Sequence, residues 1–111
     1  MAKYIKIATS GEVTELDLAG YVKLEDFYRE ISCDYVQAVP MNDVVMWLDE
    51  EGKLTGKLMN QIASEMFWEH FPNGNDFIVG DVILTAEEDE DGNLLGFSDE
   101  KIAQFSSLVG G

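Results

Sequence analysis

Residues 43–48, Asp-Val-Val-Met-Trp-Leu, decide the fold, because five consecutive apolar residues follow the aspartate. A run this apolar predicts a strand that is covered on both faces of a sheet. It ends in the acidic turn Asp49-Glu50-Glu51-Gly52. Residues 77–84 form a second run of the same kind, and residues 58–71 between them carry apolar side chains at helical spacing. The segment therefore predicts a strand, the longest helix and another central strand, in that order.

Shorter elements precede this central segment. Alternating apolar residues at 3–8 and 13–18 predict a β-hairpin, and apolar residues recur at helical spacing over 24–31. A further strand is predicted at 35–39. We expect it to stop at Pro40, because proline has no N–H to donate to a strand ladder.

The C-terminal part of the chain predicts a last short strand near 94–97 and then a helix with Ser98 as its N-cap. Together the elements indicate one α+β domain over residues 1–111. We expect a small mixed sheet of about five to six short strands, with one long and one or two short helices.

Acidic residues far outnumber basic ones, with 22 Asp and Glu against 7 Lys and Arg and a formal net charge of −15. Binding to phosphate needs a basic face, so direct contact with nucleic acid or with an anionic membrane is disfavoured. Cationic surfaces on other proteins, or metal cations, become the natural partners. The alternative is that the acidity only keeps the protein soluble and monomeric.

Cysteine usage and the N-terminal residues indicate a cytoplasmic protein. Cys33 is the only cysteine, so the chain has no disulfide framework. Residues 1–7 are too short and too regularly alternating for a signal peptide. No apolar run approaches the length of a membrane span.

The residues offer no recognisable catalytic site. His70 is the only histidine, so with Cys33 it cannot complete a set of zinc ligands. The chain contains neither a nucleophile elbow nor a phosphate-binding glycine loop. We therefore predict a protein that is not an enzyme, with no catalytic residues, cofactor or metal, in which His70 is solvated or capping and Cys33 is a small buried apolar residue.

One string resembles a calcium-binding loop. Glu87, Asp89, Asp91 and Gly92 have the spacing of such a loop, but its twelfth position is Ser98 instead of the bidentate glutamate. No helix is predicted before it. An acidic hairpin tip explains the same residues, and calcium binding remains the alternative.

Imitation of DNA would require the acidic residues to be clustered. A chain of this size exposes roughly 6,000 Å², so evenly spread charge amounts to about one per 400 Å², against about one per 110 Å² for duplex DNA. Acidic residues do gather at 49–51, 87–91 and 99–100. If the strands at 43–48 and 77–84 run parallel, as a strand–helix–strand unit allows, the two larger clusters leave the same edge of the sheet and form one anionic rim.

Three groups of residues carry a resemblance to a known family: Asp49-Glu50-Glu51-Gly52-Lys53-Leu54, then Asn60 with Ala63, then Ile78-Val79-Gly80-Asp81-Val82. On these residues the chain resembles a family of small domains of unknown function (DUF3846-like), encoded mainly by bacteriophages, plasmids and integrated elements. The resemblance extends loosely over residues 4–97 and is specific over 43–84. It implies no catalytic residues.

The resemblance does imply a biological context. Small acidic phage proteins often inhibit host defence nucleases of the restriction or CRISPR type, whose nucleic-acid channels are basic. We therefore expect a binding protein in the cytoplasm of the host bacterial cell that presents a DNA-mimicking acidic surface to such a channel. The expected contact residues are Asp49, Glu50, Glu51, Glu87, Glu88, Asp89, Glu90 and Asp91.

Two other functions remain open. One is a sponge that sequesters a nucleotide immune signal, for which Lys53 and Lys57 are the available cations. The other is a non-catalytic adaptor that binds proteins through an exposed strand or through the face of Trp68. Met46 and Met66 are predicted to be core residues, whereas the spacing of Met59 and Trp68 is compatible with either core or surface.

Overall fold

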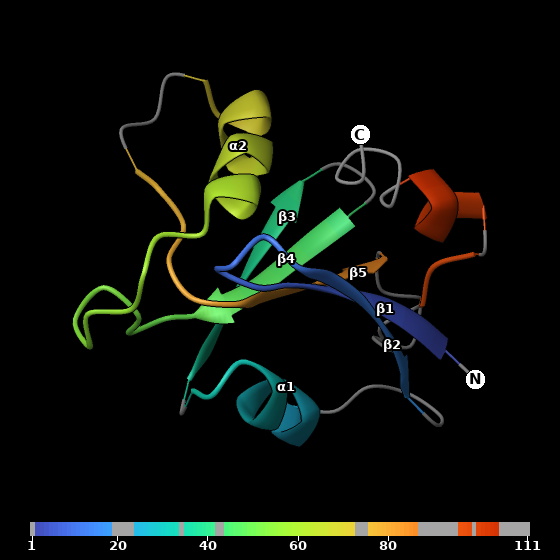
Figure 1. Ribbon diagram of the computed structural model, residues 1–111, viewed down its shortest axis with the longest axis horizontal. Helices are drawn as coiled ribbons and strands as arrows, with labels where there is room; N and C mark the ends of the chain where they lie inside the picture. Colours follow the sequence, from blue (N-terminus) through green and yellow to red (C-terminus); the bar gives the residue numbers. More distant parts are fainter. Residues whose placement is uncertain are drawn as a thin grey trace.

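The computed structural model describes residues 2–18, 24–33, 35–41, 44–72, 76–86, 96–98 and 100–104. The described strands form one five-stranded sheet in the order β2-β1-β5-β4-β3, so the apolar run that begins at Val44 lies inside the sheet (Figure 1). Along the chain the elements are β1 (Ala2–Ile7), β2 (Val13–Leu18), α1 (Leu24–Glu30), β3 (Val36–Met41), β4 (Val44–Asp49), α2 (Gln61–His70) and β5 (Val82–Ala86).

Every pairing in this sheet is antiparallel, so the predicted mixed sheet is wrong. The two central strands β4 and β5 are themselves antiparallel, with Met46 opposite Leu84. The reason lies in the segment that joins them, which does not cross from one end of the sheet to the other. An isolated bridge between Met59, which precedes α2, and Val79, which follows it, holds the two ends of this connecting segment together. The chain therefore enters β5 from the end at which it left β4.

Pro40 lies within β3, although the sequence predicted that the strand would stop there. The Glu50 N–H donates to the Tyr35 carbonyl at 3.0 Å, and this bond sets the alternation of the β3–β4 ladder. Odd-numbered residues of β3 direct their backbone groups to β4, and even-numbered ones direct them outward. The missing N–H of Pro40 thus falls on the free edge, where it costs no ladder bond.

Helix α2 has ten residues and begins at Gln61, three residues after the predicted start. Asn60 ends the preceding loop as the N-cap, and its side-chain oxygen accepts a hydrogen bond from the Ala63 N–H at 3.1 Å. Leu58 consequently lies outside the helix and is 73% exposed. The longest described helix is this one, so the expected long helix is not confirmed.

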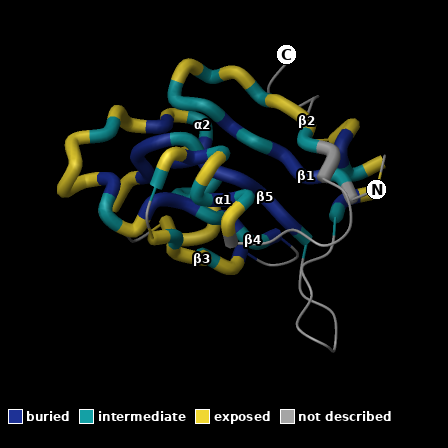
Figure 2. Tube along the Cα trace, turned by 90° about the horizontal axis from the view of Figure 1, so that it is seen from below, coloured by how far each residue is buried: buried dark blue, intermediate teal, exposed yellow. Residues whose placement is uncertain are grey.

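Helices cover both faces of the sheet, with α1 on one side and α2 on the other (Figure 1). Ala63 of α2 and Ile102 of the helical turn at residues 100–104 pack on a cluster that includes Met46 and Leu84, with Met66 packed beside it. On the α1 face, Phe27, Ile31, Tyr4 and Ile83 form a second cluster, and the ring of Phe27 stacks on Trp47 with centroids 4.6 Å apart. Buried residues accordingly follow the middle of the sheet (Figure 2).

This arrangement confirms several local predictions, although the strand predicted at 77–84 is observed as β5, which runs only from Val82 to Ala86. β4 is covered on both faces, the hairpin β1–β2 and helix α1 form where expected, and Met46 and Met66 belong to the core. Ser98 caps the last helical turn, since its hydroxyl oxygen accepts from the Lys101 N–H at 3.2 Å. Of the predicted strand near 94–97, residues 94 and 95 lie outside the described part of the chain, and residues 96 and 97 are not in a strand. No described helix has the length and apolar character of a membrane span.

Candidate functional site

Asp49, the first of the predicted contact residues, is an internal structural residue. Its side chain is 6% exposed and its Oδ2 lies 2.8 Å from Lys57 Nζ. The other oxygen, Oδ1, accepts the Glu51 N–H at 2.9 Å. Asp49 is therefore buried and committed to contacts within the chain, whereas Glu50 is exposed and Glu51 is half-buried.

The two lysines near this turn are also engaged. Lys57 Nζ donates to the carbonyls of Ile31 and Ser32, both at 2.9 Å, where α1 ends. With Asp49 these bonds occupy all three donors of its ammonium group. Lys53 forms an ion pair with Asp76, and its Nζ lies 4.6 Å from the centroid of the Phe77 ring. Both lysines are therefore paired with carboxylates of the same chain.

The residues that carry the family resemblance hold the core together. Asn60 is fully buried and its Nδ2 donates to the carbonyls of Ile7 and Gly80, both at 2.9 Å. Gly52 is packed so closely that an added Cβ would lie 2.8 Å from Val79 Cγ2. Gly80 has φ of +77°, a conformation that side-chain-bearing residues avoid. These residues fix the loop after β4, the start of α2 and the entry to β5.

The acidic stretches 49–51 and 87–91 do not leave the same edge of the sheet, contrary to the expectation from parallel strands. β5 ends at Ala86, which lies opposite Val44 at the first residue of β4. Asp49 ends β4 at the other end of the same ladder. Because β4 and β5 are antiparallel, the two acidic stretches follow strand ends that lie at opposite ends of the β4–β5 ladder. A single anionic rim made by both turns is not supported, and Glu87, Glu88, Asp89, Glu90 and Asp91 themselves lie outside the described residues.

The remaining candidate residues have ordinary surroundings. His70 is exposed at the C-terminal end of α2, and Cys33 packs half-buried against the α1-face cluster. The Trp68 indole N–H donates to the Asp76 carbonyl at 2.7 Å. This half-buried ring therefore supports residues 76–79, the segment that returns from α2 toward β5 (the return segment). Met59 is 40% exposed. Among the side chains that the structure describes, no three His, Cys, Asp or Glu residues gather at a possible metal site; the calcium-like string at 87–93 falls outside that part.

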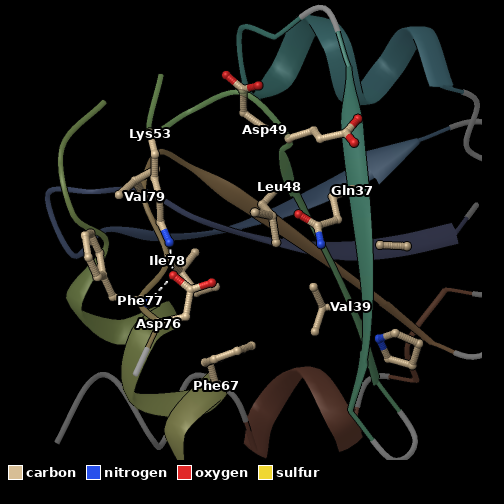
Figure 3. A pocket seen from close by; sticks show the side chains of 13 residues that line it. Gln37, Val39, Leu48, Asp49, Lys53, Phe67, Asp76, Phe77, Ile78 and Val79 are labelled. Carbon is tan, nitrogen blue, oxygen red and sulfur yellow. Dashed lines mark hydrogen bonds and ion pairs between the residues drawn. The ribbon is translucent and has the colours of Figure 1, made fainter. Parts of the chain in front are cut away.

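The structure adds a groove that the sequence did not predict. A cavity of about 430 Å³ lies between β3 and residues 76–79 (Figure 3). Val39, Leu48, Phe67 and Ile78 give it apolar walls, and its polar lining residues are Gln37, Asp49, Glu50, Lys53 and Asp76. Strand β3 and residues 76–79 are far apart in sequence. They come together because the segment that contains α2 returns to the end of the sheet from which it left. The sequence feature that points to the position of β3 at the edge of the sheet is Pro40, because proline within a sheet is confined mainly to edge strands.

Comparison with protein families gives a match over nearly the whole chain. Residues 2–110 match the model of the family described as Domain of unknown function (DUF3846), in agreement with the resemblance seen in the sequence. Neither the curated proteins nor the solved structures gave a match.

Proposed function

The chain belongs to the DUF3846 family of domains of unknown function, and we propose that it is a non-catalytic binding protein whose partner is a cationic surface on another protein. The observation that carries this proposal is the way in which its few basic side chains are used. Among the residues that the structure describes, five basic side chains lie within 3.9 Å of a carboxylate of the same chain, namely Lys3, Lys6, Arg29, Lys53 and Lys57.

Each ion pair holds a basic group beside a carboxylate of the same chain, so these basic groups do not stand as isolated positive charges on the surface. What remains on the surface is the excess of carboxylates over ammonium and guanidinium groups. Glu50, Glu51, Glu12, Glu65 and Glu69 form no ion pair with another described residue, and all but the half-buried Glu51 are exposed. A field of one sign attracts partners of the opposite sign and repels nucleic acid and anionic lipid.

The partner class that best fits is a host defence nuclease of the restriction or CRISPR type, with the protein encoded by a mobile element. Such nucleases hold nucleic acid in basic channels that an anionic protein could enter. Glu50 and Glu51 are the described contact residues of this proposal, and residues 87–91 are retained as further contacts. Because the two stretches leave β4 and β5 at opposite ends, duplex imitation by a single rim is not part of it.

Of the two other functions, one loses its support and one gains some. A nucleotide sponge needs free cations, but Lys53 and Lys57 are committed to Asp76 and Asp49. An adaptor that binds through an exposed strand is favoured by the position of β3 at the edge of the sheet beside a groove. The β3 edge is therefore a candidate place at which a partner protein binds.

The test uses purified nucleases with defined basic channels and measures inhibition of DNA cleavage at increasing salt concentration. We expect inhibition that weakens steeply with salt, and loss of at least tenfold in potency for E50K/E51K. The matched control is E65K/E69K, which changes the net charge equally on the exposed face of α2 and is expected to lose less than threefold. Salt-insensitive inhibition, or equal losses from both variants, would contradict the proposed contact surface. Absence of inhibition across the panel would refute the nuclease class.

A further inference from the structure

We infer that the free edge of β3 is a docking site for an extended cationic segment of a partner protein, which adds to the sheet as a further strand and places an apolar side chain in the groove beside Val39. This inference rests on the proposed function, since it assumes a cationic partner. It names the place and the form in which that partner is bound.

The outer edge of β3 presents regularly spaced backbone groups. The bond from the Glu50 N–H to the Tyr35 carbonyl fixes the alternation of the ladder, so Val36, Ala38 and Pro40 direct their backbone groups away from β4. Val36 and Ala38 therefore offer an N–H and a carbonyl each, and Pro40 offers a carbonyl. No described strand pairs with this edge. It is a template for strand addition.

The two edges of the sheet differ in their protection. Charged side chains on an edge strand discourage pairing with another chain. β2 at the opposite edge contains Glu15, which forms an ion pair with Lys3 at 3.4 Å. β3, with the sequence Val-Gln-Ala-Val-Pro-Met, contains no charged residue. Pro40 removes only one outward donor. Strand addition is expected at β3, because its uncharged edge lies beside a groove that can receive apolar side chains of the added strand.

The groove supplies a place for side chains of the added strand. Gln37 and Val39 point from β3 toward the cavity, and Phe67, Phe77 and Asp76 line it from the other side (Figure 3). Side chains of neighbouring strands in register lie on the same face of a sheet. Every second side chain of a strand added beyond β3 would thus project next to Gln37 or Val39, over the mouth of the groove.

Charge decides which chain occupies the site. Glu50 lines the groove, is exposed, and is held beside the start of β3 by its bond to Tyr35. It has no ion pair with a described residue, so a Lys or Arg of the added strand would gain a partner there. A second copy of this chain would bring together two bodies with a formal charge of −15 each, which like-charge repulsion opposes. The occupant is therefore a basic segment of a different protein.

The test uses a fluorescently labelled heptapeptide, acetyl-Lys-Val-Arg-Val-Lys-Val-Arg-amide, and a control peptide of equal charge in which each Val is replaced by Pro. Anisotropy measures affinity at 20 mM and 200 mM salt, and hydrogen exchange reports the backbone contact. We expect the first peptide to bind at least tenfold more tightly than the control. We also expect slower exchange at the amides of Val36 and Ala38, with Gln37 and Val39 unchanged because their N–H groups already face β4.

The matched variants are Ala38→Pro, which removes an outward N–H as Pro40 already does, and Ala38→Thr, which keeps it. We expect A38P to weaken binding of the valine peptide at least tenfold and A38T to change it less than twofold. Circular dichroism checks that A38P folds, and the proline peptide decides the matter if it does not. Equal, salt-dependent binding of both peptides would overturn strand addition and leave the cationic-partner proposal standing. No binding of either peptide at 20 mM salt would overturn both.

Discussion

Lys57 Nζ lies 2.8 Å from Asp49 Oδ2, and this pair joins the end of β4 to the loop that leads into α2. The same ammonium group donates to the carbonyls of Ile31 and Ser32 at the end of α1. One side chain thus links three separate segments of the chain. A carboxylate that the sequence marked as a partner contact serves the fold instead.

Replacing Lys57 with Met is expected to destabilise the protein by about 2 to 3 kcal/mol, because the buried Asp49 carboxylate would lose its ion pair and keep only the hydrogen bond from the Glu51 N–H. Chemical denaturation measures the loss. The control is Lys53→Met, which breaks the more exposed pair with Asp76 and should cost less than about 1 kcal/mol. The double variant D49N/K57M should recover part of the stability lost in K57M. Equal losses for K57M and K53M would show that the Asp49 pair has no special role.

Asn60 is expected to be irreplaceable by Asp, although both residues are good N-caps. Asp would still accept from the Ala63 N–H, but it has no amide to donate to Ile7 and Gly80. Two buried carbonyls would then face a carboxylate, at a cost of about 2 kcal/mol or more. Urea unfolding of N60D measures this cost, and the conservative cap exchange Ser98→Asp is the control, expected to change stability by less than about 0.5 kcal/mol. Wild-type stability of N60D would mean that capping alone explains the residue.

The elements that depend on neighbouring residues were predictable from the sequence. The β1–β2 hairpin, helix α1 and the buried β4 follow from alternation, helical spacing and an apolar run. The direction of β5 relative to β4 was not, because it depends on the long-range bridge between Met59 and Val79. A strand–helix–strand order favours parallel strands. The local sequence pattern does not indicate that the chain returns to the end of the sheet at which β4 finishes.

The candidate site was predictable only in its charge. The excess of acidic residues was plain from the composition, but the burial of Asp49 depends on Lys57, whose role is set by the end of α1. The groove beside β3 could not be predicted, because Val39 and Ile78 are far apart in the sequence and line the same cavity only in the folded chain. The sequence predicted a strand that stops at Pro40, whereas β3 continues to Met41 and Pro40 lies on its free edge.

Gly52 is expected to resist substitution for reasons of space. An alanine Cβ would lie 2.8 Å from Val79 Cγ2, so we expect G52A to cost about 1 to 3 kcal/mol. Shortening the neighbour in G52A/V79A should relieve the clash, so that the two losses are less than additive by at least about 0.5 kcal/mol. Thermal and urea unfolding of the two single variants and the double variant measure this coupling. Additive losses would place the strain of G52A elsewhere, for example on the Asp49 backbone carbonyl 3.4 Å away.

Pro40 is expected to limit pairing at the β3 edge without contributing to the ladder with β4. Replacing it with Thr should add an outward N–H, which extends the row of donors at Val36 and Ala38 by one. We expect P40T to lose less than about 1 kcal/mol of stability, mainly because the unfolded chain becomes more flexible. The valine peptide should bind P40T more tightly than wild type, by about threefold to tenfold for one added hydrogen bond. The control is Val13→Thr on the opposite edge strand, which should leave peptide affinity unchanged. Unaltered affinity of P40T would indicate that the peptide pairs elsewhere than along this edge.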